Sequence, residues 1–167
     1  MNSEVPNGKE LKVPNKISNK EQKQIILKNN CMTVKIGDKI YEALVDSGAG
    51  ISAMPKHILT LLPINLNTTL KPPKYTRAIL ANQDQCTFIG IIQLPVDIQG
   101  CIYEIPFHVL DTEQNSTLLI LGLEFLSMHC RKWDFGTNVL TLNETKQNIY
   151  KLSIEKPLTL CLSLIHI

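Results

Sequence analysis

The chain has 167 residues, of which 44% are hydrophobic, and its formal net charge at pH 7 is +2. This length accommodates one domain of ordinary size with flanking segments, and the hydrophobic content is sufficient for a core. The small net charge does not favour a nucleic-acid partner, and no apolar run approaches the roughly 18 residues that a membrane span requires.

The first thirty residues are rich in polar side chains and contain six lysines: Lys9, Lys12, Lys16, Lys20, Lys23 and Lys28. Such a composition buries little apolar surface. We therefore expect residues 1–30 to form a flexible, mildly basic lead-in, with structure beginning near Cys31. The N-terminus also lacks the apolar core of a signal peptide.

The five cysteines are odd in number and scattered, without a C-x-x-C pair: Cys31, Cys86, Cys101, Cys130 and Cys161. This spacing indicates neither a disulfide framework nor a zinc site. We therefore expect no metal, and a reducing, cytoplasmic setting.

The first predicted strands form a hairpin that leads to an acidic residue. Residues 33–36 alternate in polarity, Gly37 and Asp38 form a turn, and residues 39–45 continue as a strand. This second strand becomes wholly apolar at residues 43–45, which indicates that it enters the core. Asp46 follows at its inner end, where a carboxylate is costly unless it is hydrogen-bonded or protonated.

Further short elements follow in close succession. Residues 51–62 predict a loop with one short helical turn after Pro55. A second hairpin is expected from strands 75–80 and 86–92 around the polar tip 81–85, and a third from 94–98 and 102–110 around Gln99 and Gly100. Pro95 and Pro106 favour edges or bulges in this third pair.

The last predicted elements are a strand, a helix and a hairpin. Residues 118–121 form an apolar run closed by Gly122, and residues 123–130 have helical spacing with Leu123, Leu126 and Cys130 on one side. A strand, a turn at 136–138 and another strand occupy residues 133–142. Many short strands with one short late helix predict an all-β class and a small closed barrel.

The order Asp46-Ser47-Gly48 places a carboxylate on a tight turn after a buried strand. An alternative interpretation is that Asp46 is a turn residue that caps local backbone amides. Three features favour a functional interpretation: the preceding hairpin, the polar-tipped hairpin that follows, and a second apolar run closed by Gly122, 122 − 46 = 76 residues further on.

Residues 43–49, Ala-Leu-Val-Asp-Ser-Gly-Ala, resemble the catalytic loop of the retropepsins, the aspartic protease domains of retroviruses and long-terminal-repeat retrotransposons. Residues 119–126, Leu-Ile-Leu-Gly-Leu-Glu-Phe-Leu, are similar to the apolar-apolar-Gly segment and C-terminal helix of that family. Residues 133–135 are similar to the end of retrotransposon members. The resemblance covers residues 32–142 and implies a closed β-barrel of the retropepsin type with one short C-terminal helix. Two departures are Ser47, where many viral members have threonine, and a flap tip without glycine.

The resemblance implies roles for individual residues. Asp46 is the catalytic residue, contributed once by each of two chains, and it is supported by Ser47, Gly48 and Ala49. The expected substrate-binding residues are the flap residues Ile79, Leu80, Ala81, Asn82 and Gln83 and the pocket walls Ile51 and Leu121. For Ile79, Leu80, Ile51 and Leu121 an ordinary core position is an equally good interpretation. The chemistry requires no metal and no other cofactor.

The resemblance therefore implies an aspartic endopeptidase that acts as a homodimer on extended segments of a retrotransposon polyprotein. Its two Asp46 carboxylates would share one proton and activate a water molecule, with a bell-shaped pH–rate profile on the acidic side of neutral. The alternative is a non-catalytic module that keeps the same fold for dimerisation or peptide binding. We expect neither a membrane nor a nucleic-acid partner.

The expected domain organisation is a protease domain at 31–143 and a linker at 144–161 toward a downstream region. The last six residues, 162–167, read Leu-Ser-Leu-Ile-His-Ile. This is the translation of CTG TCT CTT ATA CAC ATC, the transposase adaptor of common sequencing libraries. We interpret these residues as adaptor-derived and expect a different continuation after about Cys161, which the genomic sequence of the locus tests.

Overall fold

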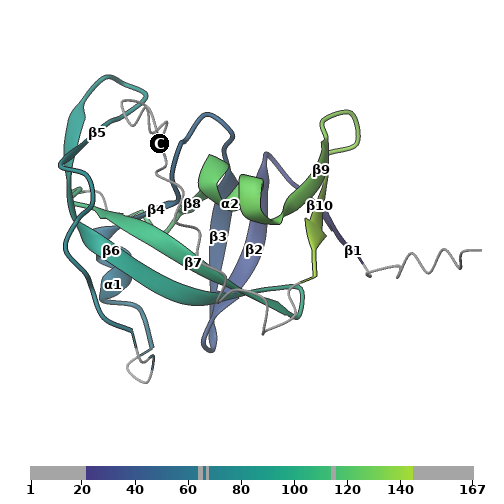
Figure 1. Ribbon diagram of the computed structural model, residues 1–167, viewed down its shortest axis with the longest axis horizontal. Coiled ribbons are helices and arrows are strands. Elements are labelled where there is room, and N and C mark those ends of the chain that lie inside the picture. Colours follow the sequence, from purple (N-terminus) through teal and green to yellow (C-terminus); the bar gives the residue numbers. More distant parts are fainter. Residues whose placement is uncertain (1–21, 64–65, 67, 114–115, 145–167) are drawn as a thin grey trace, which may run out of the picture.

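The computed structural model describes residues 22–63, 66, 68–113 and 116–144, and its secondary structure is mostly β (Figure 1). The strands and helices, in chain order, are β1 (Gln22–Ile26), β2 (Cys31–Ile36), β3 (Lys39–Val45), β4 (Ala53–Pro55), α1 (Lys56–Leu59), β5 (Arg77–Ile79), β6 (Gln85–Ile98), β7 (Cys101–Leu110), β8 (Leu119–Leu121), α2 (Leu123–His129), β9 (Cys130–Asp134) and β10 (Val139–Asn143). The predicted downstream linker, apart from Glu144, and the predicted adaptor segment lie outside the described residues.

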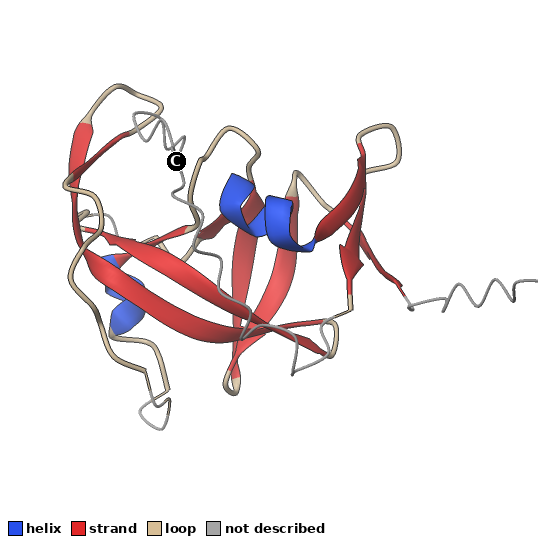
Figure 2. Ribbon diagram, in the orientation of Figure 1, coloured by secondary structure: helices blue, strands red, loops and turns tan. Residues whose placement is uncertain are grey.

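Six strands form a closed barrel of the retropepsin type, which confirms the predicted all-β fold (Figure 2). They follow one another in the order β2-β3-β8-β4-β7-β6, and the pairing of Lys35 with Asp97 joins β6 back to β2. Strand β5 pairs with β6 beyond this ring, and strands β1, β10 and β9 form a separate antiparallel sheet. A parallel pairing of β3 with β8 lies inside the barrel wall.

The turns of the predicted hairpins lie where the sequence places them. Gly37, with φ of 63°, lies between β2 and β3. Gln99 and Gly100, with φ of 50° and 87°, connect β6 to β7, and two positive φ values at the centre of a two-residue turn match the twist of antiparallel strands. The short helix α1 follows Pro55, as predicted.

The strands expected at 86–92 and 94–98 are one continuous strand, β6, which pairs with β7 from Phe88 to Ile98. Pro95 pairs with Glu104 and Pro106 with Gln93 in regular register, so of the edges or bulges expected at the prolines the bulges are wrong. Both prolines lie where their strand is paired on one side only, as the edge alternative expects. The register shift lies between Phe88 and Gly90. Its physical reason is close approach of another segment, because a Cβ on Gly90 would lie 2.4 Å from the carbonyl oxygen of Lys71.

Strand β1 lies inside the segment 1–30 for which the sequence predicts no structure, so the expected start near Cys31 is too late. It pairs antiparallel with β10, from Gln22 opposite Asn143 to Ile26 opposite Val139. Its anchor is Ile25, which is only 3% exposed. An average composition over thirty residues hides this short apolar stretch. Residues 1–21 lie outside the described residues.

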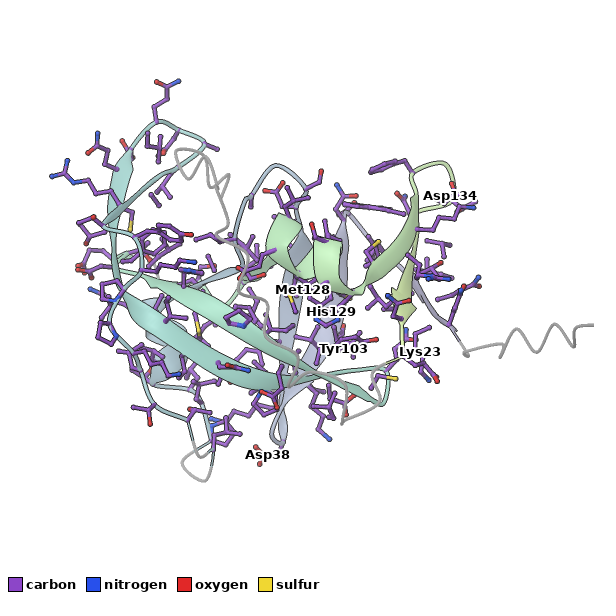
Figure 3. The ribbon with its side chains drawn as sticks, viewed as in Figure 1. Lys23, Asp38, Tyr103, Met128, His129 and Asp134 are labelled. Carbon is purple, nitrogen blue, oxygen red and sulfur yellow. The ribbon has the colours of Figure 1, made fainter. Side chains whose placement is uncertain are left out.

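Helix α2 buries a different face from the one predicted. Leu123 is 44% exposed, whereas Phe125, Leu126 and His129 are buried. His129 packs edge-on against Tyr103 of β7, with ring centroids 4.9 Å apart, at the position that Figure 3 labels. Cys130 belongs to β9 instead of the helix. The helix is thus turned so that the face bearing Phe125 and His129 packs on the barrel.

Two apolar clusters make up the core. The larger fills the barrel and includes Tyr103, Phe107 and Leu121. The second cluster lies between the loop after β3 and the hairpin β5–β6, and its members are Ala49, Ile51, Ala53, Ala78, Cys86, Phe88, Leu110 and Ile120, with Tyr75 and Leu80 packed against it. Among the described residues, no helix has the length and apolarity needed to cross a bilayer.

Candidate active site

Asp46 lies where two parallel strands end side by side. Val45, the last residue of β3, pairs with Leu121, the last residue of β8. The backbone N–H of Asp46 donates to the carbonyl oxygen of Leu121 at 3.0 Å. Because the strands run parallel and end together, the loop that starts at Asp46 meets Gly122, the residue that connects β8 to α2.

The turn after Asp46 holds its carboxylate by one local hydrogen bond and closes on its backbone by another. The backbone N–H of Gly48 donates to Asp46 Oδ1 at 2.8 Å, and the N–H of Ala49 donates to the Asp46 carbonyl oxygen at 3.2 Å. The Asp46 side chain is half-buried, Ser47 and Gly48 are exposed, and Ala49 is fully buried. The carboxylate therefore does cap its own turn, as the alternative interpretation expects, yet it stays accessible from one side.

The loop bearing Asp46 is packed directly onto Gly122. A Cβ at Gly122 would lie 2.2 Å from the carbonyl oxygen of Ile51 and 2.6 Å from that of Ala49. The first N–H groups of α2 also bond to this loop: Leu123 donates to Ala49 at 2.7 Å, and Glu124 donates to the Gly50 carbonyl at 3.2 Å. Since no side chain caps α2, the loop itself satisfies the helix start.

Ser52 and His108 support this junction, and sequence reasoning did not assign either residue a role at the site. Ser52 is 1% exposed, and its Oγ accepts the N–H of Gly122 at 3.2 Å. Its carbonyl oxygen accepts the backbone N–H of His108 at 3.0 Å and lies 3.2 Å from His108 Nδ1. The one available signal is a serine within the apolar run 51–55, which indicates a buried hydroxyl with a structural partner.

The hairpin of β5 and the first part of β6, residues 77–88, is named the flap hairpin below. Its tip is a three-residue turn, because Gln83 N–H donates to the Leu80 carbonyl at 2.8 Å and Leu80 N–H donates to the Asp84 carbonyl at 2.8 Å. Gln83 has φ of 69°, the left-handed conformation that this turn requires at its third position. The expected tip residues Ala81, Asn82 and Gln83 are all exposed.

The structure separates the predicted pocket walls. Ile51 and Leu121 are both fully buried, Ile51 in the second cluster and Leu121 in the barrel core. Ile79 and Leu80 are half-buried, and Leu80 packs against the second cluster together with Ala49. These positions favour the core interpretation for Leu121 and Ile51, and they bring Leu80 closest to the role predicted for it.

Burial shifts the ionisation of two groups near this junction. Burial lowers the pKa of His108 to about 4; the bond to the Ser52 backbone opposes this shift and the charge of Lys74 adds to it. Burial raises the pKa of Glu124 in the first turn of α2, against a lowering by Lys74. Lys74 therefore lies within electrostatic range of both groups.

A cavity of about 600 Å³ lies away from this site, beside β1, β2 and the β6–β7 turn. Ile26 and Ile40 line it together with Thr33 and Asp97. None of the residues predicted for catalysis borders this cavity, so we assign it no role in the chemistry of Asp46.

Comparisons with known proteins bear on this geometry. The model of the family described as gag-polyprotein putative aspartyl protease matches residues 32–128, more than half of the chain. No curated protein gave a match. The solved retroviral protease-like domain of Ddi1 from Leishmania major is 21% identical, with a TM-score of 0.53, and the match covers 74% of this chain and 98% of that one. This similarity shows a shared retropepsin-like fold.

Two further solved structures are similar at lower scores. A retropepsin-like aspartic protease from Rickettsia conorii is 19% identical, with a TM-score of 0.47, covering 74% of this chain and 93% of that one. The EIAV protease complexed with an inhibitor is 18% identical, with a TM-score of 0.47, covering 60% of this chain and 88% of that one.

Proposed function

The chain belongs to the gag-polyprotein putative aspartyl protease family, and from this premise we propose that it is an aspartic endopeptidase that acts as a homodimer. The observation that carries the proposal is the placement of Asp46 on a loop docked against Gly122 at the ends of β3 and β8. The chain contains one Asp-Ser-Gly motif, so two catalytic carboxylates require two copies.

The proposed reaction uses the two Asp46 carboxylates across a two-fold axis. Two carboxylates a few ångström apart cannot both ionise easily, so they share one proton. The ionised carboxylate takes a proton from a bound water, while the protonated one donates a hydrogen bond to the scissile carbonyl oxygen. The water attacks the carbonyl carbon, and the protons pass to the leaving amine. The step involves no covalent intermediate.

The surrounding residues have separate tasks in this proposal. The N–H of Gly48 holds Oδ1 of Asp46 and so orients the carboxylate. Ser47, exposed beside it, braces the loop against the partner subunit, and Ala49 lies beneath the substrate backbone. The flap hairpin covers an extended peptide that binds as an added strand and excludes water.

The proposed substrate is an extended segment of a polyprotein from a retrotransposon. The family description, which names gag polyproteins, supports this substrate class. The open backbone edge of a hairpin also favours extended peptides over folded surfaces, because extended chains alone can pair along it.

A peptide-cleavage assay tests the proposal. The purified chain is incubated with a library of extended peptides beside its Asp46→Asn variant, which keeps the side-chain shape. We expect the unaltered chain to cleave a subset of peptides, and the variant or a pepstatin-type inhibitor to reduce the rate about a thousandfold or more. Cleavage that survives Asp46→Asn contradicts the proposal. Peptide binding without cleavage by the unaltered chain supports the non-catalytic module instead.

A further inference from the structure

His108 of β7 lies at the base of the flap hairpin. Its side chain is 3% exposed and is enclosed by two aromatic rings. Tyr75, two residues before β5, stacks on it with ring centroids 5.5 Å apart and planes inclined by 28°. Phe88, at the end of the hairpin, meets it edge-on at 5.8 Å. The imidazole is therefore a packing centre for both arms of the hairpin.

The same ring also contacts the segment that follows the Asp46 turn. His108 Nδ1 lies 3.2 Å from the carbonyl oxygen of Ser52, and the hydroxyl of Ser52 accepts the N–H of Gly122. Gly122 in turn lies against the carbonyl oxygens of Ala49 and Ile51. A continuous set of contacts thus runs from the flap hairpin through His108 and Ser52 to the catalytic loop.

The burial of the ring favours a neutral imidazole. The Ser52 carbonyl oxygen only accepts, so Nδ1 carries a hydrogen, and in the neutral ring Nε2 then carries a lone pair. Nε2 is buried and has no hydrogen-bond partner among the described residues. A proton there would add an N–H without an acceptor and a charge inside an apolar cluster, both of which are costly.

The charged and titratable groups around His108 do not compensate for such a charge. Those on the adjoining elements are Lys74 and Tyr75 before β5, Cys86 in β6, Lys56 after β4 and Asp111 after β7. Of these, Lys74 is the one whose charge acts on the ring, and it disfavours a second positive charge. Asp111 is instead paired with Lys56 at 2.6 Å.

We infer that His108 is a positioning residue that, while neutral, ties the base of the flap hairpin to the Ser52–Gly122 junction beneath Asp46, and that its protonation releases the hairpin. The inference deepens the proposed function, on which its consequence for catalysis rests. The hairpin would then loosen in acid independently of the state of the Asp46 carboxylates.

Linkage sets the size of the effect. The tied state has a His108 pKa of about 4, whereas the released ring returns toward its ordinary value of 6.5. The hairpin's opening constant should therefore rise as the pH falls through this window, approaching a factor of about 300 below pH 4. Above about pH 7 it should not change.

Hydrogen exchange measured by NMR on the full chain carrying Asp46→Asn tests the inference without any substrate or activity. The quantities are the exchange rates of flap-hairpin amides between pH 7 and 4, corrected for intrinsic exchange, with the β2–β3 amides as internal reference. We expect hairpin opening to rise by about two orders of magnitude at pH 4 and to stay faster than the opening of the β2–β3 amides, which follows global unfolding and the titration of both buried histidines. Hairpin amides that exchange only at the rate of global unfolding at every pH overturn the inference.

Three variants separate the titration of His108 from its hydrogen bond and its packing. His108→Asn keeps a nitrogen donor near the Nδ1 position, and His108→Phe keeps an aromatic ring, but neither titrates. Both should abolish the pH dependence of hairpin opening, whereas His129→Asn, which removes the other buried histidine, should preserve it. Persistence of the rise in both His108 variants overturns the inference.

A direct titration keeps the test valid if a His108 variant does not fold. In the Asp46→Asn chain, the imidazole shifts of His108 should titrate with the same midpoint as hairpin opening, and midpoints that differ by more than about one pH unit contradict the tie. Because no step needs peptide cleavage, failure of the proposed enzyme activity and failure of this inference give different results.

Discussion

Gly122 is the residue on which the geometry of the Asp46 loop depends most directly. The carbonyl oxygens of Ala49 and Ile51 occupy the space that any larger side chain would need. Its own N–H is used by the buried hydroxyl of Ser52. Glycine is required here because the backbone of the Asp46 loop approaches too closely to leave room for a Cβ atom.

We predict that Gly122→Ala destabilises the fold by about 2–3 kcal/mol and displaces Asp46, because backbone atoms at 2.2 and 2.6 Å cannot give way as a flexible side chain can. Urea unfolding measures the stability and peptide cleavage measures the displacement. Gly136→Ala is the matched control, since its Cβ would meet only the carboxylate oxygen of Asp134 at 3.3 Å. Equal stability of the two variants would refute this account of Gly122.

Hydrogen bonds between residues close together in the chain can be predicted from the sequence, whereas bonds between distant residues cannot. The bond from Gly48 N–H to the Asp46 carboxylate spans two residues, so the Asp-Ser-Gly order itself implies it. The bonds of Ser52 span 56 residues to His108 and 70 to Gly122. No pattern in the chain pairs these positions, because their contact depends on how the barrel closes.

The flap hairpin shows how an element forms without the residue that its turn prefers. The third position of the tip requires positive φ, which glycine adopts without strain, yet Gln83 occupies it at 69°. The side chain of Asn82 compensates in part, since it donates to Asp84 Oδ2 at 2.6 Å and its Oδ1 accepts the N–H of Asp84 at 3.1 Å. The tip is thus held by side-chain bonds.

We predict that Gln83→Gly stabilises the flap hairpin by about 0.5–1 kcal/mol, because it removes the strain of a left-handed glutamine. The protection of the Leu80 amide against hydrogen exchange measures this, since its N–H closes the turn. Gln85→Gly, at the start of β6, should have the opposite sign. A Gln83→Gly hairpin that exchanges faster than the unaltered one would show that the turn is not strained.

The elements themselves were predictable where turn residues mark them. Gly37 and Gln99-Gly100 identify two hairpins, and the apolar run before Gly122 identifies β8. Strand β1 was missed because its contribution depends on pairing with β10, more than a hundred residues further along the chain. The face of α2 was missed because Leu123 is placed by backbone bonds to the Asp46 loop, which override the helical spacing of apolar residues.

The whole molecule carries two buried histidines whose titration opposes folding in acid. Burial lowers the pKa of both His108 and His129 to about 4 from an ordinary value of 6.5. Between these values the unfolded chain binds more protons than the folded one, so the free energy of unfolding falls as the pH falls from 6.5 to 4. The raised pKa of Glu124 acts in the opposite sense and offsets part of the fall, because its protonated form favours the folded state.

We predict that each histidine lowers the free energy of unfolding by about 2–3 kcal/mol between pH 7 and 4. Urea unfolding followed at several pH values measures the sum. Between pH 7 and 8 these two groups should contribute nothing, which serves as the control. A free energy of unfolding that stays constant down to pH 4 would contradict the burial of the two rings.

A single chain presents half of the proposed catalytic machinery. Its barrel fixes one Asp46 at the ends of β3 and β8. Its flap hairpin packs against the loop that follows Asp46, because both contribute residues to the second cluster. The retropepsin-like fold therefore supplies one carboxylate, one flap and one wall of the proposed cleft. We propose that catalysis begins only when a second copy adds the other carboxylate.

The requirement for two carboxylates is tested by the activity of mixtures of unaltered and Asp46→Asn chains, measured after free exchange of subunits at constant total concentration. If each active pair needs two Asp46 carboxylates, activity per unaltered chain should fall in proportion to the unaltered fraction, to about half in an equimolar mixture. Activity per unaltered chain that stays constant as the variant is added would show that one chain works alone and would contradict the account.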